Sequence, residues 1–400
     1  MPQNREFLLE KLFETYYSTR KNKRNTHSCA EYEVNYESHL IALCDRLLDK
    51  TYQPKRSICF ISFYPVQREI FAANFEDRII HHLIFNAINP IFERIFIHDS
   101  YSCRKNKGTS YGIKRAKRFT RAVSDNYTKE AYVLKLDIRG YFMNINKQVL
   151  YRQIFDVLGK AKLSGHSSAS MQTYPPCGGK YKHEITLDFD FLRWIIKLVV
   201  FHDPINNVLV KGRRSDWQGL PRDKSLFHAK SDTGLPIGNL TSQLFGNIYL
   251  HGMDKFIKYQ LGFKYYGRYV DDFLLFSTDR QKLVKSIEKI ASYLQSIGLE
   301  VHPKKIYLQS IKHGFKFLGV FILPHRVAID KRTKSSFYHA LRKDFSSNEE
   351  FVASINSYLG YMNNYDSFRL RRKLLFDPSL ELKVKFTANS NLSKVKIFGA

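Results

Sequence analysis

The sequence has no hydrophobic run long enough to cross a membrane. Its most apolar stretch, FLRWIIKLVVF at 191–201, is short and contains Arg193 and Lys197. The N-terminal stretch MPQNREFLLEKLFETYYS carries Arg5 and Glu10 among its apolar residues, which excludes a signal peptide. These absences predict a cytoplasmic protein without membrane attachment.

Cysteine is also scarce. The five cysteines are scattered along the chain, and no two of them form a CxxC pair. An odd number without metal-ligand spacing is typical of buried thiols in a reducing compartment. The cysteines therefore agree with a cytoplasmic location.

Acidic residues are few relative to basic ones. The chain has 37 Asp and Glu against 64 Lys and Arg, which gives a formal net charge of +27. Hydrophobic residues make up 44% of the sequence, so a folded protein is expected. A strongly positive surface attracts polyanions, of which nucleic acid is the commonest. The alternative is a basic protein whose charge serves only solubility. A membrane-surface role is disfavoured because no strongly basic amphipathic helix stands out.

The spacing of apolar residues predicts a mixture of helices and strands. Residues 1–50 have the pattern of helices, and residues 55–70 that of short strands. The stretch EDRIIHHLIFNAINPIFERIF predicts a helix interrupted at Pro90. Residues 281–297 have the spacing of an amphipathic helix that ends at Gly298.

A basic segment, SCRKNKGTSYGIKRAKRFTRAV, lies shortly before the strand-like stretch AYVLKLDI. It begins with Arg104, Lys105 and Lys107, and aromatic residues such as Tyr111 lie among its later charges. This mixture of cations and aromatics favours a contact with nucleic acid. The alternative is an ordinary solvated helix face.

Three aspartates end apolar, strand-like stretches: Asp137 follows YVLKL, and Asp271 and Asp272 follow YYGRYV. The order strand–helix–strand–strand–helix–strand can place these strands side by side in one sheet, so the carboxylates would converge. Carboxylate oxygens suit Mg²⁺, and two ions about 3.5–4 Å apart can activate a hydroxyl and stabilise a leaving pyrophosphate. An Asp pair alone is equally typical of a turn, so only the whole set favours a metal site.

Seven motifs follow one another between about residues 35 and 375. They read REIFAANFEDRIIHHLI, SYSCRKNKGT, KLDIRGYF, GLPIGNLTSQLFGNIYL, YVDD, GLEVHPKK and FKFLG. In this order and spacing they resemble the motifs of reverse transcriptases of the prokaryotic retroelement type. The resemblance implies an α+β right-hand polymerase with a ferredoxin-like antiparallel palm sheet and a helical thumb. It also implies an RNA-directed DNA polymerase, a nucleotidyltransferase that uses two Mg²⁺ ions, with Mn²⁺ as a substitute.

The resemblance assigns roles to residues at matching positions. Asp137 and Asp271 would be the main ligands of the two metal ions, with Asp272 in support. Phe142 lies at the steric-gate position that excludes a ribose 2′-OH, although an ordinary core aromatic would also suit this position. Arg68 would hold the incoming triphosphate, since an arginine fork matches phosphate geometry.

Other residues are assigned in the same way. Lys304 or Lys305 lies where the family carries a lysine near the leaving pyrophosphate, and either is equally explained as a solvated charge. Gly238 would let the backbone approach the template–nucleotide pair, because it lacks a Cβ. FKFLG would form the primer grip. The implied nucleic-acid-binding set comprises Arg104, Lys105, Lys107, Tyr269, Phe317, Leu318 and Gly319.

Two positions in the substrate-binding motif depart from the common pattern. Many reverse transcriptases carry Gln at the position of Ile237 and Pro at the position of Gln243. The form found here resembles enzymes of diversity-generating retroelements and the "unknown-group" reverse transcriptases, many of them associated with antiphage defence. Replacing an amide by Ile237 would remove a polar contact near the nucleotide.

The resemblance also divides the chain into parts. They are an N-terminal helical extension (1–50), fingers (51–130), palm (131–325), a helical thumb (326–380) and a C-terminal tail (381–400). The palm range includes a Ser-, Gly- and Pro-rich loop at 159–182 and part of the fingers. Nothing after the thumb resembles an endonuclease, an RNase H, a protease or a maturase domain, so autonomous mobility is not expected.

The expected partners are a dedicated non-coding RNA template, a DNA product and deoxynucleoside triphosphates, with an accessory protein or a homo-oligomer left open. The favoured role is cDNA synthesis in antiphage defence, and the alternative is mutagenesis in a diversity-generating retroelement. Two other classes remain, a catalytically silent RNA-binding scaffold and a two-metal nuclease. The scaffold gains nothing from clustered carboxylates, and the nuclease does not need Phe142.

Overall fold

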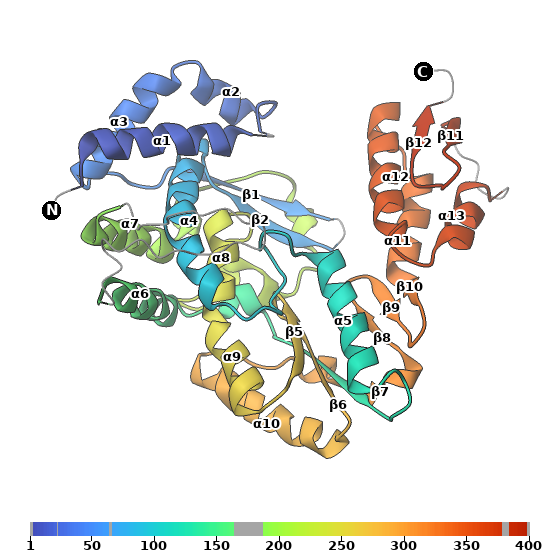
Figure 1. Ribbon diagram of the computed structural model, residues 1–400. Coiled ribbons are helices and arrows are strands. Elements are labelled where there is room, and N and C mark those ends of the chain that lie inside the picture. The colour runs from blue at the N-terminus through green and yellow to red at the C-terminus, as the bar shows by residue number, and fades with distance from the viewer. Residues whose placement is uncertain (1–2, 22, 64–65, 164–186, 378–383, 398–400) are drawn as a thin grey trace, which may run out of the picture. The chain divides into compact units, whose positions relative to one another are not determined.

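The computed structural model (Figure 1) describes residues 3–21, 23–63, 66–163, 187–377 and 384–397. The chain forms two compact units. Unit 1 comprises Met1–Cys103, Ile138–Gln260 and Lys289–His302, and unit 2 comprises Arg104–Asp137, Leu261–Glu288 and Pro303–Ala400. Both units combine helices with mostly antiparallel strands, which confirms the predicted α+β class. Within the described ranges, no helix is both long and apolar enough to span a bilayer.

Unit 1 begins with three helices, α1 (Arg5–Arg20), α2 (His27–Glu33) and α3 (Tyr36–Leu48). The first helix starts where the side chain of Asn4 accepts a hydrogen bond from the amide of Phe7. Leucines at helical spacing on α1 and α3 are buried, and these two helices contact each other. The helices expected over residues 1–50 are therefore present.

The long helix α4 (Phe75–Ile95) contacts α1 in unit 1. Its first turn carries the buried Asp77, which accepts hydrogen bonds from the hydroxyl of Tyr52 (2.5 Å) and from the amide of Lys55. Burial raises the pKa of the Asp77 carboxyl to about 6. The predicted interruption at Pro90 is wrong, since the helix continues through it. A proline costs one backbone hydrogen bond, and buried apolar residues before and after it hold both halves in place.

Unit 1 contains a small sheet in the order β2-β1-β4. Its strands are β2 (Arg68–Ala72), β1 (Ser57–Ser62) and β4 (Val208–Val210). The fully buried carboxylate of Glu69 accepts hydrogen bonds from Trp217 Nε1 (2.7 Å), Ser225 Oγ (2.8 Å) and the amide of Leu226 (2.6 Å). Glu69 therefore ties strand β2 to a distant segment, while its neighbour Arg68 is exposed.

Further helices of unit 1 are α6 (Lys147–Leu163), α7 (Phe189–Phe201), α8 (Leu240–Tyr249) and α9 (His251–Lys255). Helix α8 packs against α4 and α6. His81 Nδ1 and Thr241 Oγ1 form a 2.5 Å hydrogen bond between α4 and α8. Burial lowers the pKa of His81 to about 3, so its ring stays neutral there. Residues 159–163 of the predicted loop belong to α6, and residues 164–182 lie outside the described ranges.

Unit 2 contains a four-stranded antiparallel sheet in the order β5-β6-β3-β7. Its strands are β3 (Tyr132–Asp137), β5 (Tyr265–Tyr269), β6 (Asp272–Ser277) and β7 (Tyr307–Ser310). The first and third strands in chain order lie in the centre, which is the ferredoxin-like arrangement predicted for the palm. Helix α5 (Thr109–Val123) packs on this sheet, where its Phe119 joins Val133, Leu274 and Phe276 in one core.

The amphipathic helix expected at 281–297 is α10 (Arg280–Ser296). Its Leu283, Ile290 and Leu294 are fully buried. Gly298 follows with φ +78°, a left-handed conformation that favours glycine after a helix end.

The rest of unit 2 completes the core beneath α5 and adds a second core of its own. Its elements are β8 (Phe315–Phe317), β9 (Val320–Ile322), β10 (Val327–Ile329), α11 (Lys331–Arg342), α12 (Asn348–Met362), α13 (Phe368–Leu375), β11 (Phe386–Ala388) and β12 (Val395–Ile397). Strand β12 packs on α12, where the Asn356 amide bonds the backbone N–H and C=O of Val395. The range expected as a tail thus contains a hairpin, which the sequence pattern did not indicate.

Replacing Glu69 by Ala is expected to destabilise unit 1 by about 3 kcal/mol or more, because it leaves three buried donors without an acceptor. The neighbouring change Arg68→Ala, on an exposed side chain, should alter stability by only about 0.5 kcal/mol. Urea denaturation of the two variants beside the wild type measures the difference. Equal midpoints for the two variants would contradict the structural role of Glu69.

Candidate active site

The three predicted aspartates meet at one end of the sheet of unit 2. Strands β3 and β6 pair so that Asp137 lies directly opposite Asp272. Because side chains alternate along a strand, these two carboxylates share a face with Val133 and Phe276, which belong to the core beneath α5. An apolar surface therefore changes to an acidic one at the strand ends.

Asp271 lies in the tight turn that joins β5 to β6. Tyr269 pairs with Asp272, so Val270 and Asp271 form a two-residue hairpin loop. Val270 has φ +56°, the value that a type II′ turn requires at its first central position and that usually calls for glycine. For a β-branched residue this conformation costs about 1–3 kcal/mol. The buried Arg268 donates a hydrogen bond from Nη1 to the Val270 carbonyl (2.8 Å), which helps to hold the turn.

The surroundings of these aspartates disfavour their negative charges. Burial, and then the charge of Asp137, raise the pKa of Asp271 to about 6. Burial also raises the pKa of Asp272 to about 6, although the Lys135 ammonium opposes this shift. One oxygen of Asp272, Oδ1, is buried and has no hydrogen-bond partner in the described structure. Carboxylates held close together and partly desolvated in this way favour a bound cation.

Two lysines neutralise part of this charge. Lys305 Nζ lies 2.8 Å from Asp137 Oδ1, and Lys135 Nζ lies 2.9 Å from Asp272 Oδ2. The sequence left Lys304 and Lys305 as equal candidates, and the structure pairs Lys305 with Asp137.

Lys135 is a site residue that the sequence reasoning missed. Its ammonium also donates to the Lys316 carbonyl (3.3 Å) and lies 6.0 Å from the ring centroid of Phe317. A signal was present, because Lys135 precedes Asp137 by two positions and must therefore lie on the same face of the strand. Lys135 connects Asp272 to strand β8.

The predicted primer-grip residues form the turn between β8 and β9. Phe317 pairs with Val320, and Leu318 and Gly319 are the two loop residues, both with positive φ. The Tyr361 hydroxyl donates to the Leu318 carbonyl (2.6 Å). A Cβ on Gly319 would lie 2.9 Å from the same hydroxyl, so this position requires glycine.

The basic loop before α5 lies within unit 2. Arg104, Lys105 and Lys107 belong to this loop, and Lys105 is exposed. Thr109, at the start of α5, donates a 3.4 Å hydrogen bond to the Tyr269 hydroxyl beside the hairpin. The described contacts thus link the helix that follows the basic loop to the hairpin that carries Asp271.

The other predicted site residues belong to unit 1. Ile237 and Phe142 pack on one small core with Phe71, and the Ile237 carbonyl accepts a hydrogen bond from the Phe71 amide (2.8 Å). A Cβ on Gly238 would lie 3.0 Å from the Phe71 carbonyl, so the strand and the loop approach each other closely. Gln243 is exposed on α8. Unit 1 therefore brings Phe142, Ile237 and Gly238 to strand β2, which begins with Arg68.

The three aspartates form the candidate donor set for a divalent metal ion. Among the described residues, no three His, Cys, Asp or Glu side chains already converge as a metal site. The chemistry of the aspartates nevertheless fits a hard cation, because they supply only oxygen donors and Asp272 Oδ1 lacks a partner among the described residues. Asp137, Asp271 and Asp272 are the residues that could hold such an ion.

Comparisons with known proteins agree with this geometry. Residues 183–322 match the family described as reverse transcriptase (RNA-dependent DNA polymerase). The chain is 24% identical over 151 residues to the retron Ec86 reverse transcriptase of Escherichia coli, which covers 37% of this chain and 47% of that protein. The chain thus spans about half the length of this relative. The matches confirm the resemblance to reverse transcriptases of prokaryotic retroelements and, with the strand order of unit 2, the predicted right-hand polymerase fold.

Solved structures that are similar to parts of the chain include telomerases of two Candida species. Telomerase of Candida albicans in complex with a fragment of telomeric RNA has a TM-score of 0.45 and 13% identity, covering 81% of this chain and 55% of that chain. Apo telomerase of Candida tropicalis has a TM-score of 0.48 and 14% identity, covering 78% of this chain and 52% of that chain.

In metal-free buffer, Asp271→Asn is expected to stabilise the protein near pH 7. The raised pKa of Asp271 means that its contribution to stability is fully present below about pH 4 and is lost as the pH rises through about 6. The gain of the variant should therefore reach at most about 3 kcal/mol at neutral pH and disappear below about pH 4. Urea denaturation at several pH values measures it.

The matched control is Asp156→Asn, on an exposed face of α6. This variant should show no such pH-dependent gain. Added Mg²⁺ should stabilise the wild type and reduce its difference from Asp271→Asn. A stability difference independent of both pH and Mg²⁺ would contradict the electrostatic account.

Proposed function

We propose that this chain is an RNA-directed DNA polymerase that copies an RNA template into cDNA. The observation that carries the proposal is the pairing of Asp137 with Asp272 beside a strained hairpin turn that presents Asp271. The family match over residues 183–322 includes this hairpin. The basic surface expected from the net charge of +27 suits contacts with template and product phosphates.

Asp137 and Asp271, with Asp272 in support, would hold Mg²⁺ or Mn²⁺. Bound divalent ions would lower the pKa of a primer 3′-hydroxyl and stabilise the charge of a leaving pyrophosphate. Asp272 keeps its place through the ion pair with Lys135, which also contacts β8 of the proposed primer grip. These residues would thus set the charge around the primer 3′-hydroxyl and the leaving pyrophosphate and connect it to the proposed primer grip.

Four residues of unit 1 would bind or select the nucleotide. Phe142 would act as the steric gate; a Cβ on Gly246 would lie 3.4 Å from its ring, so α8 leaves little room behind it. Arg68 is exposed at the start of β2, where its guanidinium is available for a triphosphate. Ile237 and Gly238 would shape the surface under the template–nucleotide pair.

The biological role that we propose is cDNA synthesis from a dedicated non-coding RNA in antiphage defence. Its support is the sequence form around Ile237 and Gln243, which resembles enzymes associated with such systems. Mutagenesis in a diversity-generating retroelement is the second candidate, supported by the same motif. A template repeat next to a matching variable gene would decide for the second role.

Primer extension on an RNA template with a DNA primer tests the activity. The wild type should extend the primer with deoxynucleotides in Mg²⁺ or Mn²⁺, and Asp271→Asn should lose about a thousandfold or more in rate. Asp156→Asn, the exposed control, should retain full activity. An inactive wild type that still binds RNA would favour the scaffold, and cleavage of the template without extension would favour the nuclease.

The same comparison identifies the template. Nucleic acid that co-purifies with the wild type and with Asp271→Asn is sequenced. One discrete RNA in both samples, with complementary DNA in the wild type alone, is the expected result. Substitutions concentrated at one template base would favour the mutagenic role over defence.

Lys305→Ala is expected to lower the rate of extension about a hundredfold, because it removes the cation beside Asp137 and the proposed proton donor to pyrophosphate. Lys304→Ala is the matched control, because Lys304 is one position away and is also exposed. Its loss of extension rate should be much smaller. Single-turnover rates measured over a range of pH test this role. Equal losses in the two variants would contradict the assignment of Lys305.

A further inference from the structure

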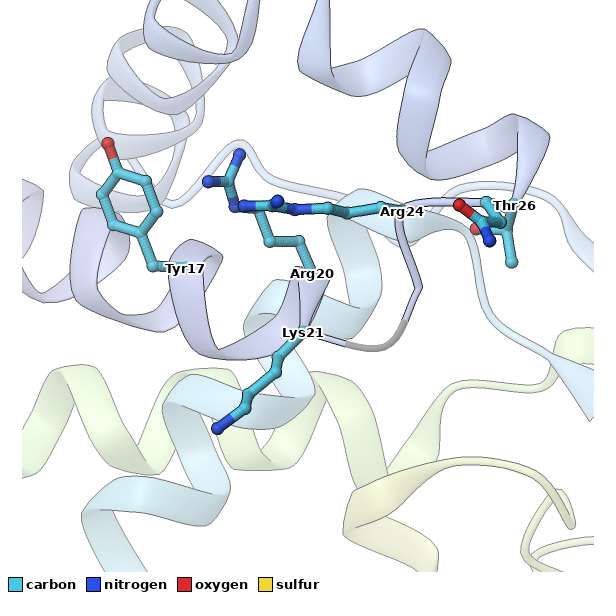
Figure 2. Close-up of a pocket in the computed structure, with 6 residues that line it drawn as sticks. Tyr17, Arg20, Lys21, Arg24 and Thr26 are labelled. Carbon is cyan, nitrogen blue, oxygen red and sulfur yellow. The ribbon is translucent and has the colours of Figure 1, made fainter.

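A basic pocket lies in the N-terminal helices of unit 1. The cavity measures about 790 Å³ and is lined by Tyr17, Arg20, Lys21, Arg24, Asn25 and Thr26. Figure 2 shows the side chains of Arg20 and Arg24 extending toward Tyr17, while Lys21 projects from the other side of the helix end. None of these residues takes part in the proposed polymerase site.

Tyr17 forms an aromatic surface at this pocket. The residue is 48% exposed, although its ring contacts Tyr16 (centroids 5.4 Å apart) and its hydroxyl lies 3.3 Å from that of Tyr36. The guanidinium of Arg20 lies 5.0 Å from the ring centroid of Tyr17. The ring is therefore held in place by its neighbours and still offers surface on which a flat ligand can stack.

The charge of the pocket is only partly neutralised. Arg20 forms an ion pair with Glu33. Lys21 and Arg24 are exposed, and in the described part of the chain neither forms an ion pair. The sequence has no acidic residue between Glu14 and Glu31. Lys21 and Arg24, which have no carboxylate beside them in the described structure, would attract an anionic ligand, and an arginine fork suits a phosphate.

We infer that this pocket binds an unpaired nucleotide segment of a single-stranded nucleic acid. A base would stack on Tyr17, and the adjoining phosphates would contact Arg24 and Lys21. Asn25 and Thr26 add an amide and a hydroxyl that can bond base edges or sugar. Aromatic stacking beside a cationic groove is the general mode of single-strand recognition. The pocket lining has no aliphatic side chain, which disfavours insertion into a lipid surface.

The inference goes beyond the proposed polymerase activity and does not need it. Its test therefore uses the full chain carrying Asp271→Asn, in which no DNA synthesis is expected. The probe is an oligouridine RNA of about 12 nucleotides that contains photoreactive thiouridine. After irradiation, the cross-linked peptides are mapped. We expect a cross-link in the peptide that contains Tyr17, and its absence would overturn the inference even if primer extension by the wild type succeeds.

Affinity measurements then separate stacking from charge. Tyr17→Leu should weaken binding of the oligouridine about tenfold, whereas Tyr17→Phe, which keeps the ring, should bind as the parent does. The double variant Lys21→Ala/Arg24→Ala should lose two phosphate contacts. Each contact on a single strand contributes about 0.7 to the slope of log binding constant against log salt concentration, so the magnitude of this slope should fall by about 1.4. Lys160→Ala/Lys197→Ala removes the same charge from exposed positions of α6 and α7 in unit 1 and should leave the Tyr17 cross-link unchanged.

Two further binding experiments define the ligand. Oligothymidine DNA of the same length distinguishes a DNA strand from an RNA strand, and preferential binding of either at the Tyr17 peptide supports the inference. Inorganic tripolyphosphate tests charge alone. Equal competition by tripolyphosphate, together with no effect of Tyr17→Leu, would reduce the pocket to a general anion site and overturn nucleotide recognition. Melting curves of every variant confirm that each remains folded.

Discussion

The constraint on which unit 2 depends is the presence of three carboxylates at the end of one antiparallel sheet. Burial, and after it their mutual repulsion, disfavours the charged form, so the pKa values of Asp271 and Asp272 rise to about 6. Two lysines, Lys135 and Lys305, reduce this cost without removing it. The arrangement has no evident structural benefit, because hydrophobic residues of similar size would pack at least as well. The proposed cation-dependent function would account for three carboxylates at the strand ends.

Other elements of unit 2 are organised around these carboxylates. The ferredoxin-like strand order brings β3 and β6 together, and the register of their pairing sets Asp137 opposite Asp272. Lys135 then reaches from the same face to the β8 backbone, so the sheet and the proposed primer grip share one contact. The Tyr361 hydroxyl holds the Leu318 carbonyl, which connects that turn to helix α12. A change at Lys135 would therefore affect both the charge of the site and its link to β8.

Much of the fold and of the candidate site was predictable from the sequence. The features that were missed or misread have physical causes. Apolar periodicity located α10, and the motif YVDD located the hairpin, because these signals are local. Pro90 was misread as a break because burial on both sides of it is a tertiary effect that spacing does not reveal. Lys135 was missed because a single lysine in a strand is usually solvated, and only the β3–β6 register brings it to Asp272. The strands β11 and β12 are short, and what stabilises them is packing on α12.

Two buried carboxylates of unit 1, Glu69 and Asp77, show how structural acids differ from those of the proposed site. Glu69 is fully buried, yet three donors surround it, and it fixes strand β2 to the segment that carries Trp217. Asp77 is likewise satisfied by the Tyr52 hydroxyl and the Lys55 amide. Asp272, by contrast, leaves Oδ1 without a partner among the described residues. A missing partner does not by itself mark a functional acid, because Oε1 of the buried Glu76 in unit 1 also lacks one among the described residues. What distinguishes Asp272 is its pairing opposite Asp137 and beside Asp271, so a cation at its free oxygen would relieve the repulsion of three carboxylates at once.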